Sequence, residues 1–258
     1  MLSDYPLNLA LATKDLGQAR AWYSEKLGFE PRWANEWLLM YREFDCAFTV
    51  YATRSAGTAQ NTVAIWNVKD LPSAMARLRG RGVTFEDYDY GDFKTVDGVA
   101  TDPDDGSLNS WFKDGDGNTW SLFYGPDDDR PERIGPMLAA SDLDRSKQWW
   151  SEKLGYTPVE QVEGVINVYR SGGKGFSIYA TQFAGTAKNT VAGFRVKDLR
   201  AEVAALRQRG VVFEDYDFPE FKTEDGIFAD PEGDMSAWFV DSEGNTVAIN
   251  EDADSSAG

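Results

Sequence analysis

The chain contains two copies of one sequence pattern, and this duplication constrains its fold more than any other feature. The segment SEKLGF at 24–29 returns as SEKLGY at 151–156, and YATRSAGTAQNTVAIWNVKDL at 51–71 returns as YATQFAGTAKNTVAGFRVKDL at 179–199. The words FEDYD and FKT, the latter followed by a variable residue and DG, come next in both halves in the same order. Collinear words at an offset of 127 or 128 residues indicate a duplicated domain rather than a short-period solenoid.

The length of 258 residues is enough for two domains that each bury a core of their own. Proline, glycine and alternating charge replace periodic apolar residues after position 125, as is typical of a linker. We therefore expect a first domain at 1–125, a linker at 126–133, a second domain at 134–250 and an acidic tail at 251–258.

The net charge of −17 repels phosphate backbones and acidic membrane surfaces, so we expect neither nucleic acid nor a membrane as a partner. A neutral or cationic small molecule meets no such barrier, although acidity can also serve solubility alone. Because no apolar run approaches the roughly 18 residues that span a bilayer and the first residues lack a secretion pattern, we expect a cytoplasmic protein. The single cysteine, Cys46, cannot form an internal disulfide.

Strand and helix patterns alternate in the same order within each half. Apolar residues alternate at 7–12, Asp15 is placed to cap a helix that follows, and Gly28 stands where a left-handed C-terminal cap is expected. Further helices are expected at 71–81, 143–154 and 199–209, with three short strands after each helix. Each half therefore predicts two βαβββ units.

Three pairs of words indicate a family resemblance. They are the aromatic helix ends AWYSEKLGF and QWWSEKLGY, the KDL helix starts at Lys69 and Lys197, and the hairpins WFKDGDGN and WFVDSEGN at 111–118 and 238–245. Because these words occur in the same order in both halves, the chain resembles the vicinal oxygen chelate superfamily, which includes glyoxalases, extradiol dioxygenases and bleomycin resistance proteins. The resemblance implies an α+β fold of two tandem domains, each with two βαβββ units that form curved mixed sheets around a cleft.

The resemblance also locates the positions where metal-dependent members of the superfamily hold their metal. Those members place His or Glu on the first strand of each unit and a Glu on the last strand. The matching positions here carry no imidazole, thiolate or carboxylate: Asn8, Val63, Ser121, Gly135, Val191 and Ala248. The chain has no histidine at all, so we expect no metal and no other cofactor. A carboxylate-only site for Mg²⁺ or Ca²⁺ stays open as an alternative.

The word DGDGN resembles the start of a calcium-binding loop. Asp114, Asp116 and Asn118 have the right spacing, but the sixth position is Thr119 instead of glycine and the twelfth is Gly125 instead of glutamate. The sequence therefore predicts a hairpin turn here.

A comparison of the two copies separates an expected core from an expected cleft. Positions that are apolar in both copies are assigned to the core: Leu38, Met40, Phe48, Val50, Ala64, Trp66 and Val68, with Ile166, Val168, Phe176, Ile178, Ala192, Phe194 and Val196. Aromatic, hydroxyl and amide side chains on the other face are typical of a small-molecule pocket. Nine residues are therefore expected to bind a ligand: Trp37, Tyr41, Tyr51, Asn67, Trp111, Tyr169, Tyr179, Arg195 and Trp238.

Each candidate also has a structural alternative. Trp111 and Trp238 could cover the edge of a sheet, and Arg195 could form a salt bridge. The FEDYD segments could supply a general base if an aspartate were desolvated, or they could be a strand that enters an acidic loop. Cys46 has no histidine to activate it as a nucleophile.

Three functions remain open from the sequence. The first is metal-independent binding of a small organic molecule, such as a cationic or aromatic antibiotic or another natural product, in the manner of bleomycin resistance proteins. The second is a metal-independent isomerase, lyase or cyclase of secondary metabolism, and the third is a glyoxalase- or dioxygenase-type metalloenzyme. This scaffold hosts both binding and catalysis, so the fold alone does not choose. We expect a monomer, because duplication could replace a homodimer, with a homodimer as the alternative.

Overall fold

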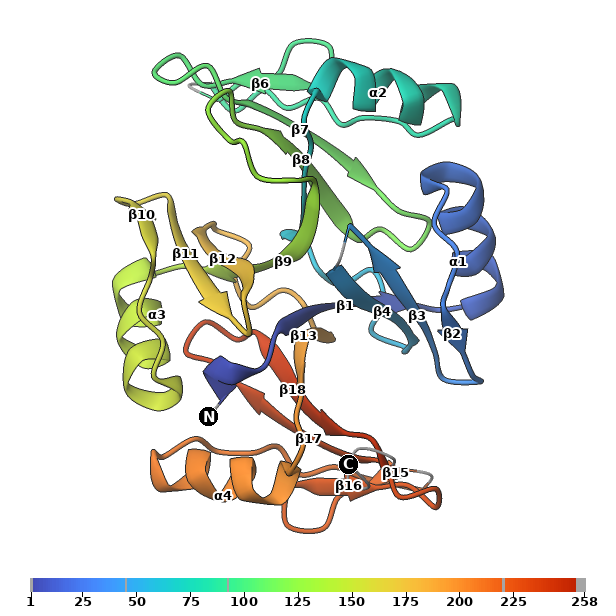
Figure 1. The fold of residues 1–258 in the computed structure, drawn as a ribbon, viewed down its shortest axis with the longest axis vertical. Coiled ribbons are helices and arrows are strands. Elements are labelled where there is room, and N and C mark those ends of the chain that lie inside the picture. Colours follow the sequence, from blue (N-terminus) through green and yellow to red (C-terminus); the bar gives the residue numbers. More distant parts are fainter. Residues whose placement is uncertain (1, 45, 92, 220, 254–258) are drawn as a thin grey trace. The chain divides into compact units, whose positions relative to one another are not determined.

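A computed structural model describes residues 2–44, 46–91, 93–219 and 221–253 (Figure 1). The contacts divide the chain into a first unit, Leu9–Met137, and a second unit formed by residues 2–8 and 138–253. Each unit contains sheets of mixed strand direction and two α-helices, so the predicted α+β fold of repeated βαβββ units is confirmed. Across the described ranges, no helix is long and apolar enough to cross a membrane.

The first unit contains two four-stranded arrangements, in the orders β1-β4-β3-β2 and β5-β8-β7-β6. In both, the first strand is parallel to the last strand of its repeat and the remaining pairs are antiparallel. The first arrangement consists of β1 (Leu7–Thr13), α1 (Leu16–Trp22), η2 (Tyr23–Leu27), β2 (Trp33–Ala34), β3 (Leu38–Glu43) and β4 (Cys46–Ala52). The second consists of β5 (Thr62–Asn67), α2 (Leu71–Gly80), β6 (Val99–Thr101), β7 (Leu108–Lys113) and β8 (Thr119–Tyr124).

The second unit repeats this plan with the orders β9-β12-β11-β10 and β13-β18-β17-β16. The unit boundaries fall within β9, after Met137, and within β1, before Leu9, so each of these strands has residues in both units. Its first repeat consists of β9 (Arg133–Ala140), α3 (Leu143–Trp149), η3 (Trp150–Leu154), β10 (Glu160–Val162), β11 (Ile166–Ser171) and β12 (Lys174–Ala180). Its second repeat consists of β13 (Thr190–Arg195), α4 (Leu199–Gln208), β16 (Ile227–Ala229), β17 (Met235–Val240) and β18 (Thr246–Glu251). A short 3₁₀ helix, η1 (Leu2–Asp4), and a small hairpin of β14 (Asp217–Phe218) and β15 (Phe221–Lys222) complete it.

Each α-helix begins at an aspartate whose carboxylate accepts a hydrogen bond from a backbone N–H in the first turn. Asp15 accepts one from Gln18, which confirms the predicted cap, and Asp142 accepts one from Arg145. α1 and α3 each continue into a π-helical turn that ends at a glycine. Gly28 has a φ of 76° in that turn, the left-handed conformation that the sequence predicts there.

The core of each unit lies between the sheets and the helices and is rich in aromatic rings. In the first unit, Tyr41 stacks on Phe48 with ring centroids 4.9 Å apart, and Tyr23 packs against both rings. The second unit repeats this with Tyr169 stacked on Phe176 at 5.0 Å. The predicted core positions on β4 and β5 and their counterparts are buried: Phe48, Val50, Ala64, Trp66 and Val68, with Phe176, Ile178, Ala192, Phe194 and Val196.

The predicted facing of β3 and β11 is wrong. Leu39 lies opposite Val50, and Tyr41 lies opposite Phe48, so Leu39 and Tyr41 share the core face with their buried partners. Leu38 and Met40 are half-buried on the other face, and Ile166 and Val168 are half-buried in the second unit. In β3 the reason is that residues 37–41 are apolar on both faces, so alternation gives no signal, and the pairing with β4 fixes the register. In β11 the alternation favours the other face, because the polar Asn167 is buried opposite Ile178.

Candidate ligand-binding surfaces

The face of each sheet that points away from the core contains a tryptophan at the same place in both units. In the first unit, Trp111 of β7 lies opposite Ser121 of β8, whose hydroxyl donates to Asn109 Oδ1 at 2.8 Å. In the second unit, Trp238 of β17 lies opposite Ala248, and the Ser236 hydroxyl donates to Asn250 Oδ1 at 2.9 Å. The core residues Phe112 and Phe239 follow these tryptophans and point to the opposite face, because side chains alternate along a strand.

In the first unit, three rings from the loop before β6 gather around this tryptophan. We call Tyr88, Tyr90, Phe93 and Trp111 the first ring cluster. Tyr88 and Phe93 each meet Trp111 edge to face, with centroids 5.6 Å apart in both pairs, and Tyr88 stacks on Tyr90 at 5.6 Å. Tyr90 is 65% exposed and Phe93 is 40% exposed. Large rings are thus held in order while much of their surface remains open to solvent.

The second unit repeats the arrangement with one more ring. We call Tyr216, Phe218, Phe221, Phe228 and Trp238 the second ring cluster. Tyr216 and Phe221 meet Trp238 edge to face at 5.6 and 5.3 Å, and Tyr216 stacks on Phe218 at 6.1 Å. Phe228 of β16 stacks on Phe221 with centroids 4.6 Å apart and ring planes 23° from parallel.

A polar clip shapes each loop that presents these rings. In the first unit, Asp87 Oδ1 accepts from the Thr95 hydroxyl at 3.0 Å and from the Gly98 N–H at 2.8 Å. Asp215 accepts the same two bonds from Thr223 at 3.0 Å and from Gly226 at 2.9 Å. Gly98 has a φ of 79°, and a Cβ there would lie 3.0 Å from the Cβ of Phe85, so a side chain would be strained and crowded.

The clip bears on the predicted alternative that an aspartate of FEDYD acts as a general base. Both Asp87 and Asp215 are exposed, and their carboxylates are engaged by the loop itself. The interpretation of FEDYD as an acidic loop fits the structure better.

Two of the nine predicted ligand residues lie in the core instead. Tyr41 and Tyr169 are fully buried, and burial raises the pKa of each hydroxyl to about 12. Neither hydroxyl has a hydrogen-bond partner among the described residues. Their prediction as cleft residues is wrong for the same reason as the facing of β3 and β11.

The other predicted residues are spread over several strands. Trp37 precedes β3 and is 64% exposed, and Tyr51 and Tyr179 are half-buried on the face of β4 and β12 away from the core. Asn67 accepts a hydrogen bond from Arg133 at 3.1 Å. Arg195 forms an ion pair with Asp252 at 3.1 Å, which confirms the salt-bridge alternative for this residue. Only Trp111 and Trp238 enter a ring cluster.

The sequence prediction missed most of the rings in the two clusters. The missed residues are Tyr88, Tyr90, Phe93, Tyr216, Phe218, Phe221 and Phe228. Six of them occur at matching places of the two copies, in or next to the words FEDYD and FKT, which were interpreted by their acidic and turn residues. The aromatic pairs Tyr88 and Tyr90, and Tyr216 and Phe218, two positions apart in each copy, were the signal that could have found them.

The donor side chains do not fit a transition-metal site. β5 and β8 place Ile65 beside Ser121, and β13 and β18 place Gly193 beside Ala248, on the faces where the resemblance implies metal ligands. Over the described ranges, no three His, Cys, Asp or Glu side chains gather closely enough to hold an ion. Imidazole, thiolate or carboxylate donors would be required.

The DGDGN segment forms a hairpin turn between β7 and β8, as the sequence predicts. Asp114 Oδ1 accepts from the backbone N–H of Asp116 at 3.0 Å and of Asn118 at 2.9 Å, and the Tyr23 hydroxyl donates to Asp114 Oδ2 at 2.7 Å. Burial raises the pKa of Asp114. Since its oxygens bind the turn and the core, this carboxylate is structural.

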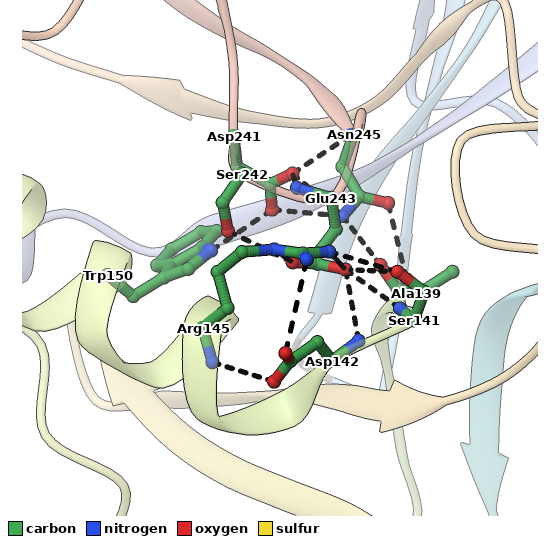
Figure 2. Close-up of polar contacts among 9 residues, drawn as sticks. All are labelled: Ala139, Ser141, Asp142, Arg145, Trp150, Asp241, Ser242, Glu243 and Asn245. Atoms are coloured by element: carbon green, nitrogen blue, oxygen red, sulfur yellow. Dashed lines mark hydrogen bonds and ion pairs between the residues drawn. The ribbon is translucent and has the colours of Figure 1, made fainter.

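The equivalent turn of the second unit is tied more firmly to its helix (Figure 2). Asp241 accepts from the N–H groups of Glu243 and Asn245, both at 2.9 Å, and Trp150 Nε1 donates to it at 3.1 Å. The Glu243 side chain is fully buried and pairs with Arg145 of α3, whose Nε donates at 2.8 Å. Despite desolvation, the Arg145 guanidinium and the hydrogen bonds from residues 141 and 142 lower the pKa of Glu243.

Comparison with known proteins agrees with this architecture. The sequence pattern of the Glyoxalase/Bleomycin resistance protein/Dioxygenase superfamily matches residues 7–122 and again residues 133–249. Among curated proteins, none is similar in sequence at a significant level.

Solved structures share the fold at low sequence identity. Glyoxalase I from Zea mays superposes with a TM-score of 0.67 at 14% identity, over 96% of this chain and 93% of that one. A candidate dioxygenase from Bacillus subtilis superposes with a TM-score of 0.59 at 14% identity, over 95% of this chain and 84% of that one. At these identities the similarity shows the fold alone.

Proposed function

Since the chain belongs to the glyoxalase, bleomycin resistance protein and dioxygenase superfamily, we propose that it binds a small organic molecule with a planar aromatic part, without a metal. The observation that supports this function is the presence of the same partly exposed ring cluster on the non-core face of both units. Antibiotics and other natural products with fused or linked rings belong to this ligand class.

Several large rings of the clusters are exposed to solvent. Tyr90, Phe93 and Phe218 are between 40% and 65% exposed, yet each is held against a half-buried neighbour. Grouped apolar surface that stays exposed marks binding sites more often than isolated apolar residues do. Aromatic pairs gain about 0.5–1.5 kcal/mol beyond their buried area, so several rings together could bind a planar ligand.

The charge of the chain favours one kind of ligand over another. A net charge of −17 repels anions at long range and attracts cations. A cation near the face of an aromatic ring gains about 0.5–2 kcal/mol, depending on its desolvation. The preferred ligand is therefore neutral or cationic.

The predicted enzymatic alternatives have less support. An isomerase, lyase or cyclase would need an acid or base beside the rings, but the clip carboxylates, Asp87 and Asp215, are bound within their loops. A glyoxalase- or dioxygenase-type reaction would need metal donors that the strand positions do not supply. A cytoplasmic location and a monomeric state remain part of the proposal.

Calorimetric titration with a panel of neutral, cationic and anionic ring compounds tests this function. The wild type should bind at least one neutral or cationic compound, and the double variant Phe93→Ala/Phe221→Ala should lose that binding. Trp33→Ala removes a ring that is 50% exposed and lies outside both clusters and the nine expected ligand residues, and it should bind as the wild type does. No binding by any compound, or equal binding by the double variant, would refute the proposal.

A further inference from the structure

The two ring clusters differ at one position that corresponds between the copies. The central residue of β16 is Phe228, whereas the central residue of β6 is Ala100. Phe228 lies opposite Ser236, and Ala100 lies opposite Asn109. Ser236 and Asn109 each precede the cluster tryptophan by two residues, so Phe228 and Ala100 occupy the same place on the same face.

The contacts with the cluster tryptophan are similar in the two units. Phe93 meets Trp111 at 5.6 Å and 74°, and Phe221 meets Trp238 at 5.3 Å and 64°. The contacts of Tyr88 and Tyr216 with these tryptophans are both 5.6 Å long. The clusters differ in the extra ring of Phe228 on Phe221 and in the near-parallel contact of Tyr90 with Phe93 at 6.4 Å.

This extra ring covers Phe221. The ring centroids of Phe221 and Phe228 lie 4.6 Å apart, within the range of an offset stacked pair. Phe221 is half-buried. Phe93 has no ring at the place of Phe228; Tyr90 lies nearly parallel to it with centroids 6.4 Å apart, and Phe93 is 40% exposed. The second cluster thus contains, within the chain, the ring that the first cluster lacks.

We propose that a planar aromatic ring of the ligand stacks on Phe93 where Phe228 stacks on Phe221, so that each chain has one such site, in the first unit. This inference rests on the proposed function and narrows it to a ligand with at least one flat, uncovered ring. The first cluster also has the Tyr90 hydroxyl where the second has Phe218, which suits a ring with a polar substituent.

The site is tested with proflavine, a flat cationic tricyclic dye, by isothermal titration calorimetry. The wild type should bind one dye per chain. Ala100→Phe should supply the missing ring internally and weaken binding about tenfold or more, the scale of a lost stacking contact. Phe228→Ala should uncover Phe221 and raise the stoichiometry to two dyes per chain.

A matched pair of variants locates the wild-type site. Phe93→Ala should weaken dye binding about tenfold or more, and Phe221→Ala should leave the affinity at the first cluster unchanged. Circular dichroism shows whether each variant is folded. If Ala100→Phe does not fold, the stoichiometry of Phe228→Ala and the Phe93→Ala and Phe221→Ala pair still decide the question.

The outcomes separate this inference from the proposed function. Two dyes per wild-type chain, an unchanged stoichiometry in folded Phe228→Ala, or loss of binding in Phe221→Ala alone overturns the inference and leaves ligand binding standing. If neither the wild type nor Phe228→Ala binds the dye while another ring compound binds, the inference fails alone. If no ring compound binds to the wild type or to Phe228→Ala, both the inference and the proposed function fail.

Discussion

Replacement of Glu243 by glutamine should destabilise the protein far more than the equivalent change in the other copy. The Glu243 carboxylate is fully buried, and it accepts from Ser141 N at 2.8 Å, Asp142 N at 3.2 Å and two N–H groups of Arg145 at 2.8 and 2.9 Å. Glutamine keeps one oxygen but turns an N–H₂ group toward the other donors. The equivalent residue, Asp116, accepts one bond, from Lys14 N at 2.9 Å.

The size of the effect follows from these contacts. Hydrogen bonds to a charged group contribute about 1.5–3 kcal/mol each, and a buried donor that loses its acceptor costs about 1–3 kcal/mol. Arg145 is 53% exposed, so water takes over part of its loss, and we expect Glu243→Gln to lower the free energy of unfolding by about 2 kcal/mol. Asp116→Asn keeps an oxygen for its single bond and should cost less than about 0.5 kcal/mol.

The pH dependence gives a second measurement of the same contacts. The folded pKa of Glu243 lies below its ordinary value of 4.5, so its ionised form stabilises the fold above about pH 4.5. That stabilisation is lost as pH falls through the folded pKa, where the glutamate becomes neutral as glutamine is. The difference between wild type and Glu243→Gln should therefore shrink between pH 7 and pH 3.5.

Urea unfolding followed by circular dichroism measures all three proteins. Equal losses in Glu243→Gln and Asp116→Asn would refute the reasoning from the hydrogen bonds. A difference between wild type and Glu243→Gln that stays constant from pH 7 to pH 3.5 would refute the reasoning from the pKa.

Two further predictions address the core and the metal. Tyr41→Phe and Tyr169→Phe remove buried hydroxyls that have no partner among the described residues. Each variant should therefore leave the free energy of unfolding unchanged or raise it by up to about 1 kcal/mol. A decrease of more than about 1 kcal/mol, measured by urea unfolding, would contradict this. Treatment with EDTA should leave ligand affinity unchanged, and elemental analysis of protein purified without chelator should find no transition metal in a one-to-one ratio; a stoichiometric, tightly held ion would contradict the mismatch of donors.

Much of the fold could be predicted because local signals and the duplication agree. Asp15 and Gly28 mark the ends of one helix through their side-chain and backbone preferences, and the hairpin at Asp114 follows from turn residues alone. These features depend on a few neighbouring residues. They recur at the same places in the second copy, so each prediction has two independent occurrences to support it.

The facing of β3 could not be predicted in the same way. Its residues are apolar on both sides, and only the pairing of Tyr41 with Phe48 determines which side is buried. The ring clusters were missed for a related reason. Tyr88 and Phe93 meet Trp111 across 23 and 18 positions of sequence, and the loop that brings them together is shaped by the contact of Asp87 with Thr95 and Gly98.

That clip has a consequence for how such a protein could change over evolutionary time. The bonds among Asp87, Thr95 and Gly98 involve no aromatic side chain. Tyr90 and Phe218 occupy matching places on equally clipped loops, so substitution there has already occurred without loss of the loop's shape. Selection could therefore change the ligand preference of the proposed site by exchanging single aromatic residues, while the hydrogen bonds that shape the loop stay the same.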